Sequence, residues 1–361
     1  MLKATPVHEL AASASRRRLL RPMPGLIVLA IILAAAALLS LSVGPSGITL
    51  MALPRVIAEV AGTAHQSSGH EALVLLDIRL PRTLLAIYVG ASLAVAGAMM
   101  QGLFRNPLAD PGLIGVSSGA ALAAVSVISF GDAYFPNVKA ALGVHALPVA
   151  AFIGGVTATA LLVAVTSGRR AVSTSALLLA GIAVAALAQA LMGLVAYLSD
   201  ERSLRDLTLW NLGSLAGASW SKVLGALPFA VLFVALLPRL VRDLNGLLLG
   251  EAEAYHLGVE VRRAKLLIVL ATAAAVGAAV AVAGIVGFIG IVTPHIVRLF
   301  AGPDHRVLLP ASALLGGTLA LAADMVARVA VSPAELPLGI VTAIIGAPFF
   351  LHLVLRRGVH G

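Results

Sequence analysis

The chain has 361 residues, of which 60% are hydrophobic, 11% are charged and none is cysteine. A soluble domain usually has about 25% charged residues, so this composition excludes an ordinary soluble fold, a disordered chain, a coiled coil and a disulfide scaffold. The formal net charge is +9. In the membrane protein that remains, the positions of the positive residues say more than their sum.

Nine charge-free windows are the candidates for membrane-spanning helices, since a helix needs about 20 apolar residues to cross the hydrocarbon core. They are residues 26–54, 83–104, 112–131, 140–168, 171–199, 223–238, 266–297, 307–323 and 336–355. The seventh window is 32 residues long, and the glycines of Gly284–Gly290 in it would allow a re-entrant turn. Splitting the window there predicts ten helices.

The basic segment 1–22 precedes the first window and is predicted to be cytoplasmic. The apolar stretch Leu26–Val43 is longer than a usual signal-peptide core, and no clear A-x-A cleavage site follows it. It is therefore predicted to be a retained first helix. With ten helices and both termini in the cytoplasm, 17 of the 25 Lys and Arg residues lie inside. The sequence thus predicts a single transmembrane domain over residues 23–357.

Small residues recur at helical spacing in two rows, which begin at Gly90 and at Gly115. Such rows let helix backbones approach closely in lipid, and tight bundle packing is their ordinary interpretation. The first row continues with Ala94 and Ala98, the second with Gly119 and Ala123.

The most polar inner segment is residues 239–265. Within it, Leu247–Leu257 is predicted to form a short amphipathic helix that Gly258 stops. Such a helix lies either on lipid or in the groove of a partner protein. Glu251 and Glu253 disfavour an anionic lipid surface, so we expect docking on a cytosolic protein.

The chemistry of common catalytic motifs is missing. No G-x-x-x-x-G-K-[ST] loop occurs, so the chain is not expected to hydrolyse ATP by that route. Gly115–Gly119 matches the G-x-S-x-G pattern, but it lies near the start of an apolar helix instead of after a strand. An intramembrane enzyme using Ser117 is therefore only an alternative. The histidines fit no standard zinc pattern, so no metal site is expected.

Asp324 and Arg328 are ionisable residues inside an apolar segment, and their spacing of four places them on one helix face. A structural intrahelical pair is one interpretation. A second alternative is a secondary carrier, for which Asp324 would be the coupling carboxylate. Such carriers usually have several carboxylates at the membrane midplane, and this chain offers one.

Several segments, in this order, resemble the permease subunits of type II ABC importers for vitamin B12, ferric siderophores and haem. They are Arg79–Thr83, Gly97–Gln101, Asn106–Gly112, Ser173–Ser175, Leu177–Gly181, Gly284–Gly290, Pro294–His295, Asp304–Pro310, Ala334–Gly339 and Gly346–Pro348. The likeness covers about residues 75–357. The segment Arg205–Trp220 looks most like haem-transporting members.

The resemblance implies an all-α, polytopic permease of ten helices that works as a homodimer in the bacterial inner membrane. Its partners would be two cytoplasmic ATPase subunits, which use ATP and Mg, and a periplasmic substrate-binding protein. The chain itself would bind no cofactor and no nucleic acid. Its cargo would be haem or another iron chelate moved into the cytoplasm, with a ferric siderophore or vitamin B12 as the alternative.

The resemblance also assigns three groups of residues. The resemblance implies that Arg79, Arg82 and Arg328 bind acidic residues of the substrate-binding protein. Arginine suits bidentate pairing with carboxylates. The cytoplasmic gate falls to Asn106, Leu108, Thr174 and Ser175. Coupling to the ATPase falls to a loop at about residues 240–263, through Gly250, Glu251, Ala254, Leu257 and Gly258.

Overall fold

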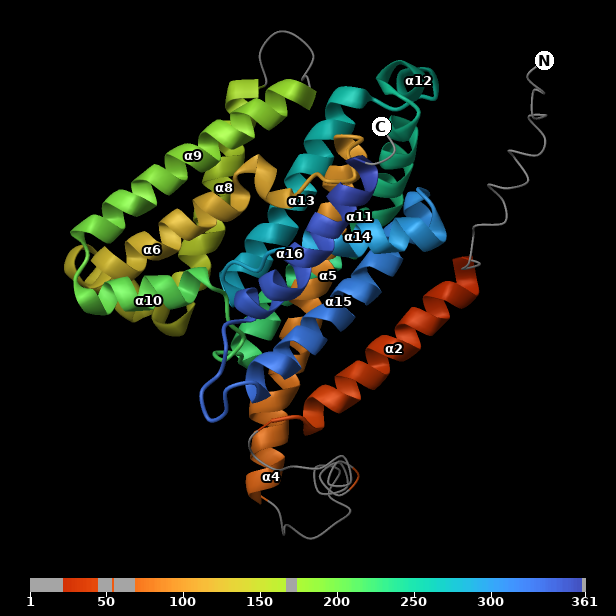
Figure 1. Ribbon diagram of the computed structural model, residues 1–361. Helices are drawn as coiled ribbons and strands as arrows, with labels where there is room; N and C mark the ends of the chain where they lie inside the picture. Colours follow the sequence, from red (N-terminus) through yellow and green to blue (C-terminus); the bar gives the residue numbers. More distant parts are fainter. Residues whose placement is uncertain (1–21, 45–53, 55–68, 167–173, 359–361) are drawn as a thin grey trace, which may run out of the picture.

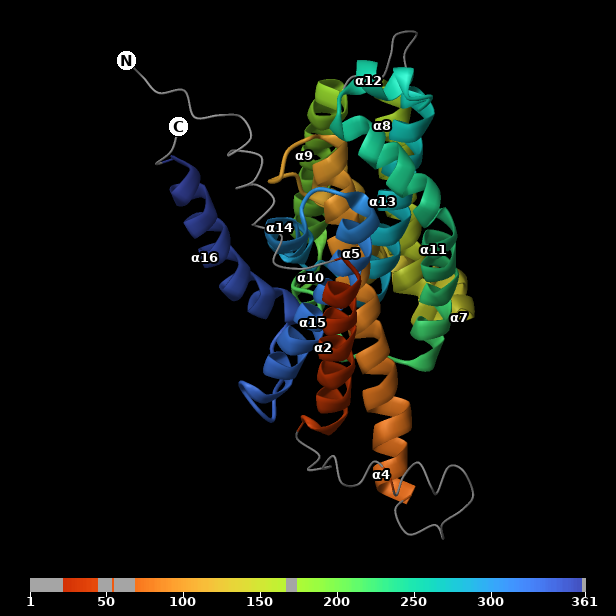
Figure 2. The ribbon, with the colours of Figure 1, turned by 90° about the vertical axis from the view of Figure 1, so that its right-hand side faces the viewer.

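The computed structural model describes residues 22–44, 54, 69–166 and 174–358. Within those ranges every regular element is a helix (Figures 1 and 2). The predicted cytoplasmic segment 1–22 lies, apart from Pro22, outside the described residues. The same holds for Ser173 and for the basic pair at 169 and 170.

Among the described residues, eight helical stretches are long and apolar enough to cross a membrane. They are α2 (Pro22–Ser42), the rod formed by α4 (Gly69–Leu73), a π-helical segment (Val74–Arg79) and α5 (Leu80–Leu103), α6 (Val116–Tyr134), α7 (Pro136–Leu142) with α8 (Ala146–Thr166), α9 (Thr174–Leu198), α11 (Trp220–Leu248), α13 (Val261–Ala283) and α15 (His305–Val329). Shorter apolar stretches lie in α14 (Ile289–Ala301) and α16 (Leu338–Gly358). The described chain is therefore a polytopic helical membrane protein.

Two short helices lie outside these stretches. The first, α10 (Glu201–Asn211), follows α9, and the second, α12 (Glu251–His256), joins α11 to α13. Figure 1 places α12 at one end of the bundle and α4 at the other. We call these the α12 end and the α4 end.

Several helices extend past the bounds expected from charge-free windows, and two of them show why. The rod that contains α5 starts before residue 83 and includes Arg79 and Arg82. Helix α11 runs past Arg239 and Asp243 to Leu248. A charge does not end a helix when a partner compensates it within the fold. Arg82 pairs with Asp324 at 2.9 Å, and Arg239 lies 3.6 Å from Asp243 on its own helix.

The break predicted at Gly284–Gly290 is confirmed. Helix α13 ends at Ala283, Gly284 takes a φ of 71°, and α14 begins at Ile289. A Cβ on Gly284 would lie 2.4 Å from the carbonyl oxygen of Trp210, so a larger residue does not fit there. Phe288 also takes a positive φ, 66°, which is rare for a bulky residue. The chain therefore reverses at this point within the bundle.

The two predicted rows of small residues lie at close helix crossings, which confirms their packing role. A Cβ on Gly90 would lie 2.2 Å from the carbonyl oxygen of Gly316, so α5 touches α15 backbone to backbone. A Cβ on Gly119 would lie 2.6 Å from the carbonyl oxygen of Gly154, so α6 meets α8 in the same way. Helix α5 also packs against α11, α13 and α14, and thus forms the centre of the bundle (Figure 2).

Gly97→Ala is expected to lower the free energy of unfolding by about 1–3 kcal/mol, the usual cost of overpacking a core. The added Cβ would lie 1.7 Å from the carbonyl oxygen of Gly290, where α5 crosses α14. Thermal unfolding of the detergent-solubilised chain measures the effect. The matched control is Gly225→Ala in α11, where nothing lies within 4 Å of the added Cβ. Equal melting temperatures for the two variants would contradict the close crossing.

Candidate functional site

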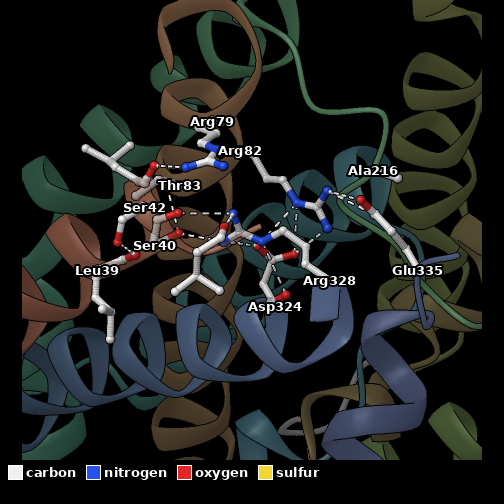
Figure 3. A network of polar contacts seen from close by, with 12 residues as sticks. Leu39, Ser40, Ser42, Arg79, Arg82, Thr83, Ala216, Asp324, Arg328 and Glu335 are labelled. Carbon is white, nitrogen blue, oxygen red and sulfur yellow. Dashed lines mark hydrogen bonds and ion pairs between the residues drawn. The ribbon is translucent and has the colours of Figure 1, made fainter. Parts of the chain in front are cut away.

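The end of α2 is fastened by arginines. The last carbonyl groups of a helix have no partner within the helix, and they form the negative end of its dipole. Arg328 Nη1 donates to the carbonyl oxygens of Ser40, at 3.1 Å, and Val43, at 3.0 Å, and Arg79 Nη1 donates to that of Leu41 (Figure 3). These bonds tie α2 to α15 and to the rod that contains α5.

Asp324 lies between two arginines in the same network (Figure 3). Its Oδ1 accepts from Arg82 Nε at 3.0 Å and Nη2 at 2.9 Å, and its Oδ2 lies 2.9 Å from Arg328 Nη2. Arg82 turns its remaining edge to Glu335, whose Oε1 accepts from Nη1 at 3.0 Å. The pair predicted between Asp324 and Arg328 is therefore real, and it is part of a larger cluster that joins α5, α15 and the loop before α16.

The structure brings together the three arginines expected to dock a binding protein, but it buries them. Arg79, Arg82 and Arg328 are only 4%, 6% and 4% exposed, and their guanidinium groups bind carboxylates and carbonyls of their own chain. Glu335 is the most exposed member of the cluster, with 32% of its side chain accessible. An incoming carboxylate would therefore have to displace an internal partner. The docking role stays a prediction.

The loop after α5 holds Asn106 and Leu108, two of the expected gate residues. Asn106 Oδ1 accepts from the backbone N–H of Leu108 at 3.0 Å, and Asp110 Oδ1 accepts from that of Gly112 at 2.7 Å. The first bond is a local side-chain turn, and in the second Asp110 caps the 3-10 helix Pro111–Ile114. Burial raises the pKa of the Asp110 carboxyl, although the Gly112 N–H opposes this effect. The loop is thus shaped by its own polar residues.

Thr174 and Ser175, the other expected gate residues, form the first turn of α9. The loop after α5 packs on α9 about two turns further along, at Gly181. A Cβ on Gly181 would lie 1.8 Å from the carbonyl oxygen of Leu113. The connection between α5 and α6 therefore touches α9 at Gly181, a residue that the sequence marked only as part of a motif.

The predicted helix at Leu247–Leu257 is wrong at its start and right at its end. Helix α11 continues to Leu248, the chain turns at Gly250 with a φ of 122°, and α12 begins at Glu251. Gly258 takes a φ of 78° directly after the helix C-cap, which is the predicted stop. The helix is shorter because Leu247, which is buried, and Leu248 belong to the last turn of α11.

Ala254 is fully buried, with 0% exposure, so it packs α12 onto its own chain and does not face a partner. Large apolar side chains point outward instead. Leu249, Tyr255 and Leu257 are 64%, 72% and 59% exposed. We call these three residues the α12 face. Leu257 was among the expected coupling residues, whereas Leu249 and Tyr255 were missed because their burial depends on where α11 ends.

A polar cluster near the same end joins α11 to α15. Asn245 Nδ2 donates to Asp304 Oδ1 at 2.8 Å, and Asn245 Oδ1 accepts from the backbone N–H of His305 at 2.9 Å. Burial would raise the pKa of Asp304, but bonds from the Arg306 N–H and the Asn245 amide outweigh it, so the pKa is lowered. Asp304 therefore caps α15 as a carboxylate.

Comparison with known proteins decides the family. A family model described as the FecCD transport family matches residues 31–356, nearly the whole described bundle. The chain belongs to the FecCD transport family.

Relatives of this FecCD chain are permeases. It is 47% identical over 301 residues to the hemin transport system permease protein HmuU of Yersinia pestis, covering 82% of this chain and 87% of that one. It is 45% identical over 290 residues to the cobalamin import system permease protein BtuC of Halobacterium salinarum, covering 80% and 74%. A solved structure described as an inward-facing conformation of a metal-chelate type ABC transporter aligns with a TM-score of 0.79 at 34% identity, covering 92% and 98%.

The geometry of this FecCD chain does not support the two alternative functions, a secondary carrier that uses Asp324 and an intramembrane enzyme that uses Ser117. Asp324 binds two arginines with both oxygens, which does not suit a carboxylate that must take up and release an ion. Ser117 is the second residue of α6 and follows a 3-10 turn, so the strand that a nucleophile elbow needs is not there. Among the described residues no group of three or more His, Asp and Glu could hold a metal ion.

Proposed function

We propose that this chain is the permease subunit of an ATP-driven importer that carries haem, or another iron chelate, from the periplasm to the cytoplasm. The family match over residues 31–356 carries the proposal. The relative named for hemin is 47% identical and the relative named for cobalamin 45%. A ferric siderophore or vitamin B12, moved by the same mechanism, is therefore the second candidate cargo.

The proposed assembly has two copies of the chain in the bacterial inner membrane, two cytoplasmic ATPase subunits and a periplasmic substrate-binding protein. Ten crossings with both termini inside are supported by the eight long apolar helices together with the shorter apolar stretches of α14 and α16. On this proposal the α12 end is cytoplasmic. ATP and Mg belong to the ATPase subunits, and the chain holds no cofactor and binds no nucleic acid.

Three groups of residues carry the proposed work. Arg79, Arg82 and Arg328 meet the binding protein at the α4 end. The cytoplasmic gate is formed by Asn106, Leu108, Thr174 and Ser175. Support for coupling to the ATPase comes from the α12 face, since large apolar side chains exposed on a polar end are typical of an interaction surface.

Uptake into vesicles tests the cargo. The permease is reconstituted with its ATPase and binding protein, and haem, vitamin B12 and a ferric siderophore are offered separately with ATP. We expect ATP-dependent accumulation of haem. Accumulation of vitamin B12 or the siderophore alone would replace haem as cargo while keeping the importer, and accumulation of none of them would reject the proposed cargo class.

A further inference from the structure

The Glu251 side chain is 45% exposed, but its carboxylate contacts two neighbouring helices of the same chain, unlike the α12 face beside it. Glu251 is the first residue of α12, and one carboxylate oxygen, Oε1, makes two contacts with other helices. Lys265 Nζ of α13 lies 2.7 Å from it, and Thr174 Oγ1 of α9 donates to it at 3.3 Å. A single side chain therefore connects the starts of three helices at the α12 end.

The two contacts differ in strength. The side chain of Lys265 is only 3% exposed, and a buried charge requires compensation, so its ion pair with Glu251 holds α12 to α13. The hydrogen bond from Thr174 is longer, comes from an uncharged donor and is exposed to solvent. When α12 and α13 shift together, Glu251 shifts with them, and its bond to Thr174 is the contact that is made or broken at the first turn of α9.

We infer that Glu251 is a positioning residue that transmits movement of α12 to the first turn of α9. The inference rests on the proposed function, in which α12 is moved by an ATPase and the start of α9 belongs to the gate. It adds the residue pair that carries the movement, Glu251 and Thr174, and it separates Glu251 from the α12 face. A docking role would leave Thr174 without influence on coupling.

The test compares transport with ATP hydrolysis in the same vesicles, which contain the complete complex and haem, or vitamin B12 if that is the cargo. Thr174→Val removes the donor and keeps the shape of the side chain. We expect ATP hydrolysis to persist and the cargo moved per ATP to fall about threefold, the effect of losing one weak, solvent-exposed hydrogen bond. Thr174→Ser keeps the hydroxyl and should restore the ratio, which a purely structural role of the methyl group would not predict.

The matched control is Thr157→Val in α8, whose hydroxyl bonds only to the carbonyl of Ile153 in its own helix at 2.8 Å. It should keep the wild-type ratio. An unchanged ratio in Thr174→Val, or a Thr174→Ser variant as impaired as the valine variant, would overturn the inference.

A second measurement needs no transport and so separates this inference from the proposed function. The chain has no cysteine, so Ala252→Cys on α12 and Leu179→Cys on α9 give two unique spin-label positions. In labelled chain diluted with unlabelled chain, Glu251→Gln and Thr174→Val should each broaden the distance distribution between the labels. Identical distributions in wild type and both variants would reject the connection, and wild-type vesicles that hydrolyse ATP without uptake would reject the proposed function alone.

Discussion

Asp324→Ala should lower the free energy of unfolding by about 3–5 kcal/mol, because two buried guanidinium groups then lose their shared counter-charge. Asp324 is 1% exposed and lies within 2.9 Å of both Arg82 and Arg328. The loss should also loosen α2, whose last carbonyl groups Arg328 caps. Thermal unfolding in detergent measures the effect, and limited proteolysis at the end of α2 locates it.

A second variant of Asp324 and a control variant of Asp132 test whether the buried charge causes this effect. Asp324→Asn keeps the shape but presents an amide in place of the negative charge, so it should be nearly as destabilising as alanine. Asp132→Ala removes the acid of an exposed ion pair, in which Asp132 is 82% accessible and lies 2.6 Å from Lys139. Exposed pairs contribute about 0–1 kcal/mol, so this control should barely change the melting temperature. Equal shifts at positions 324 and 132 would show that the buried cluster is not what holds this end together.

Replacing the α12 face with serine, through Leu249→Ser, Tyr255→Ser and Leu257→Ser together, should weaken binding of the ATPase at least a hundredfold. Full burial of one large apolar side chain is worth about 1.5–3 kcal/mol, and each 1.4 kcal/mol is tenfold in affinity. The permease should stay folded, because these side chains are already 59–72% exposed. Co-purification of the ATPase with the permease and ATP-driven uptake both measure the effect.

The matched control replaces three equally exposed apolar residues far from α12 in sequence. Tyr134, Phe135 and Val144 are 72%, 62% and 74% exposed around α7. On the proposed orientation they lie on the outer side, so their triple serine variant should bind the ATPase normally. Retained ATPase binding in the α12 variant, or its loss in the control, would contradict the assignment of the α12 face.

Local patterns in the sequence predicted what depends on neighbours in the chain. The glycines of Gly284–Gly290 predicted the break, and Gly258 predicted the stop of α12, because both effects depend on backbone freedom at one position. The start of α10 could also have been predicted. Asp200 accepts a hydrogen bond from the N–H of Ser203 at 2.9 Å, and an aspartate before a polar helical stretch is a strong N-cap signal.

The arginine cluster could not be predicted in the same way. Arg82 and Asp324 are 242 positions apart, so no spacing rule connects them, and Glu335 joins them from a third segment. The charge of Arg82 therefore delayed the start of one expected window, and that of Asp324 ended another too early. Arg82 was accordingly interpreted as an outer surface residue. The burial of Ala254 was missed for a related reason, because it depends on how far α11 extends.

On the proposed function, this chain conducts its cargo but draws the energy from a separate ATPase. The most direct test measures cargo uptake by vesicles that contain either the chain alone with a proton gradient or the complete complex with ATP. We expect uptake only by the complete complex, and we expect this uptake to be lost when ATP is replaced by a non-hydrolysable analogue. Gradient-driven uptake by the chain alone would contradict this expectation.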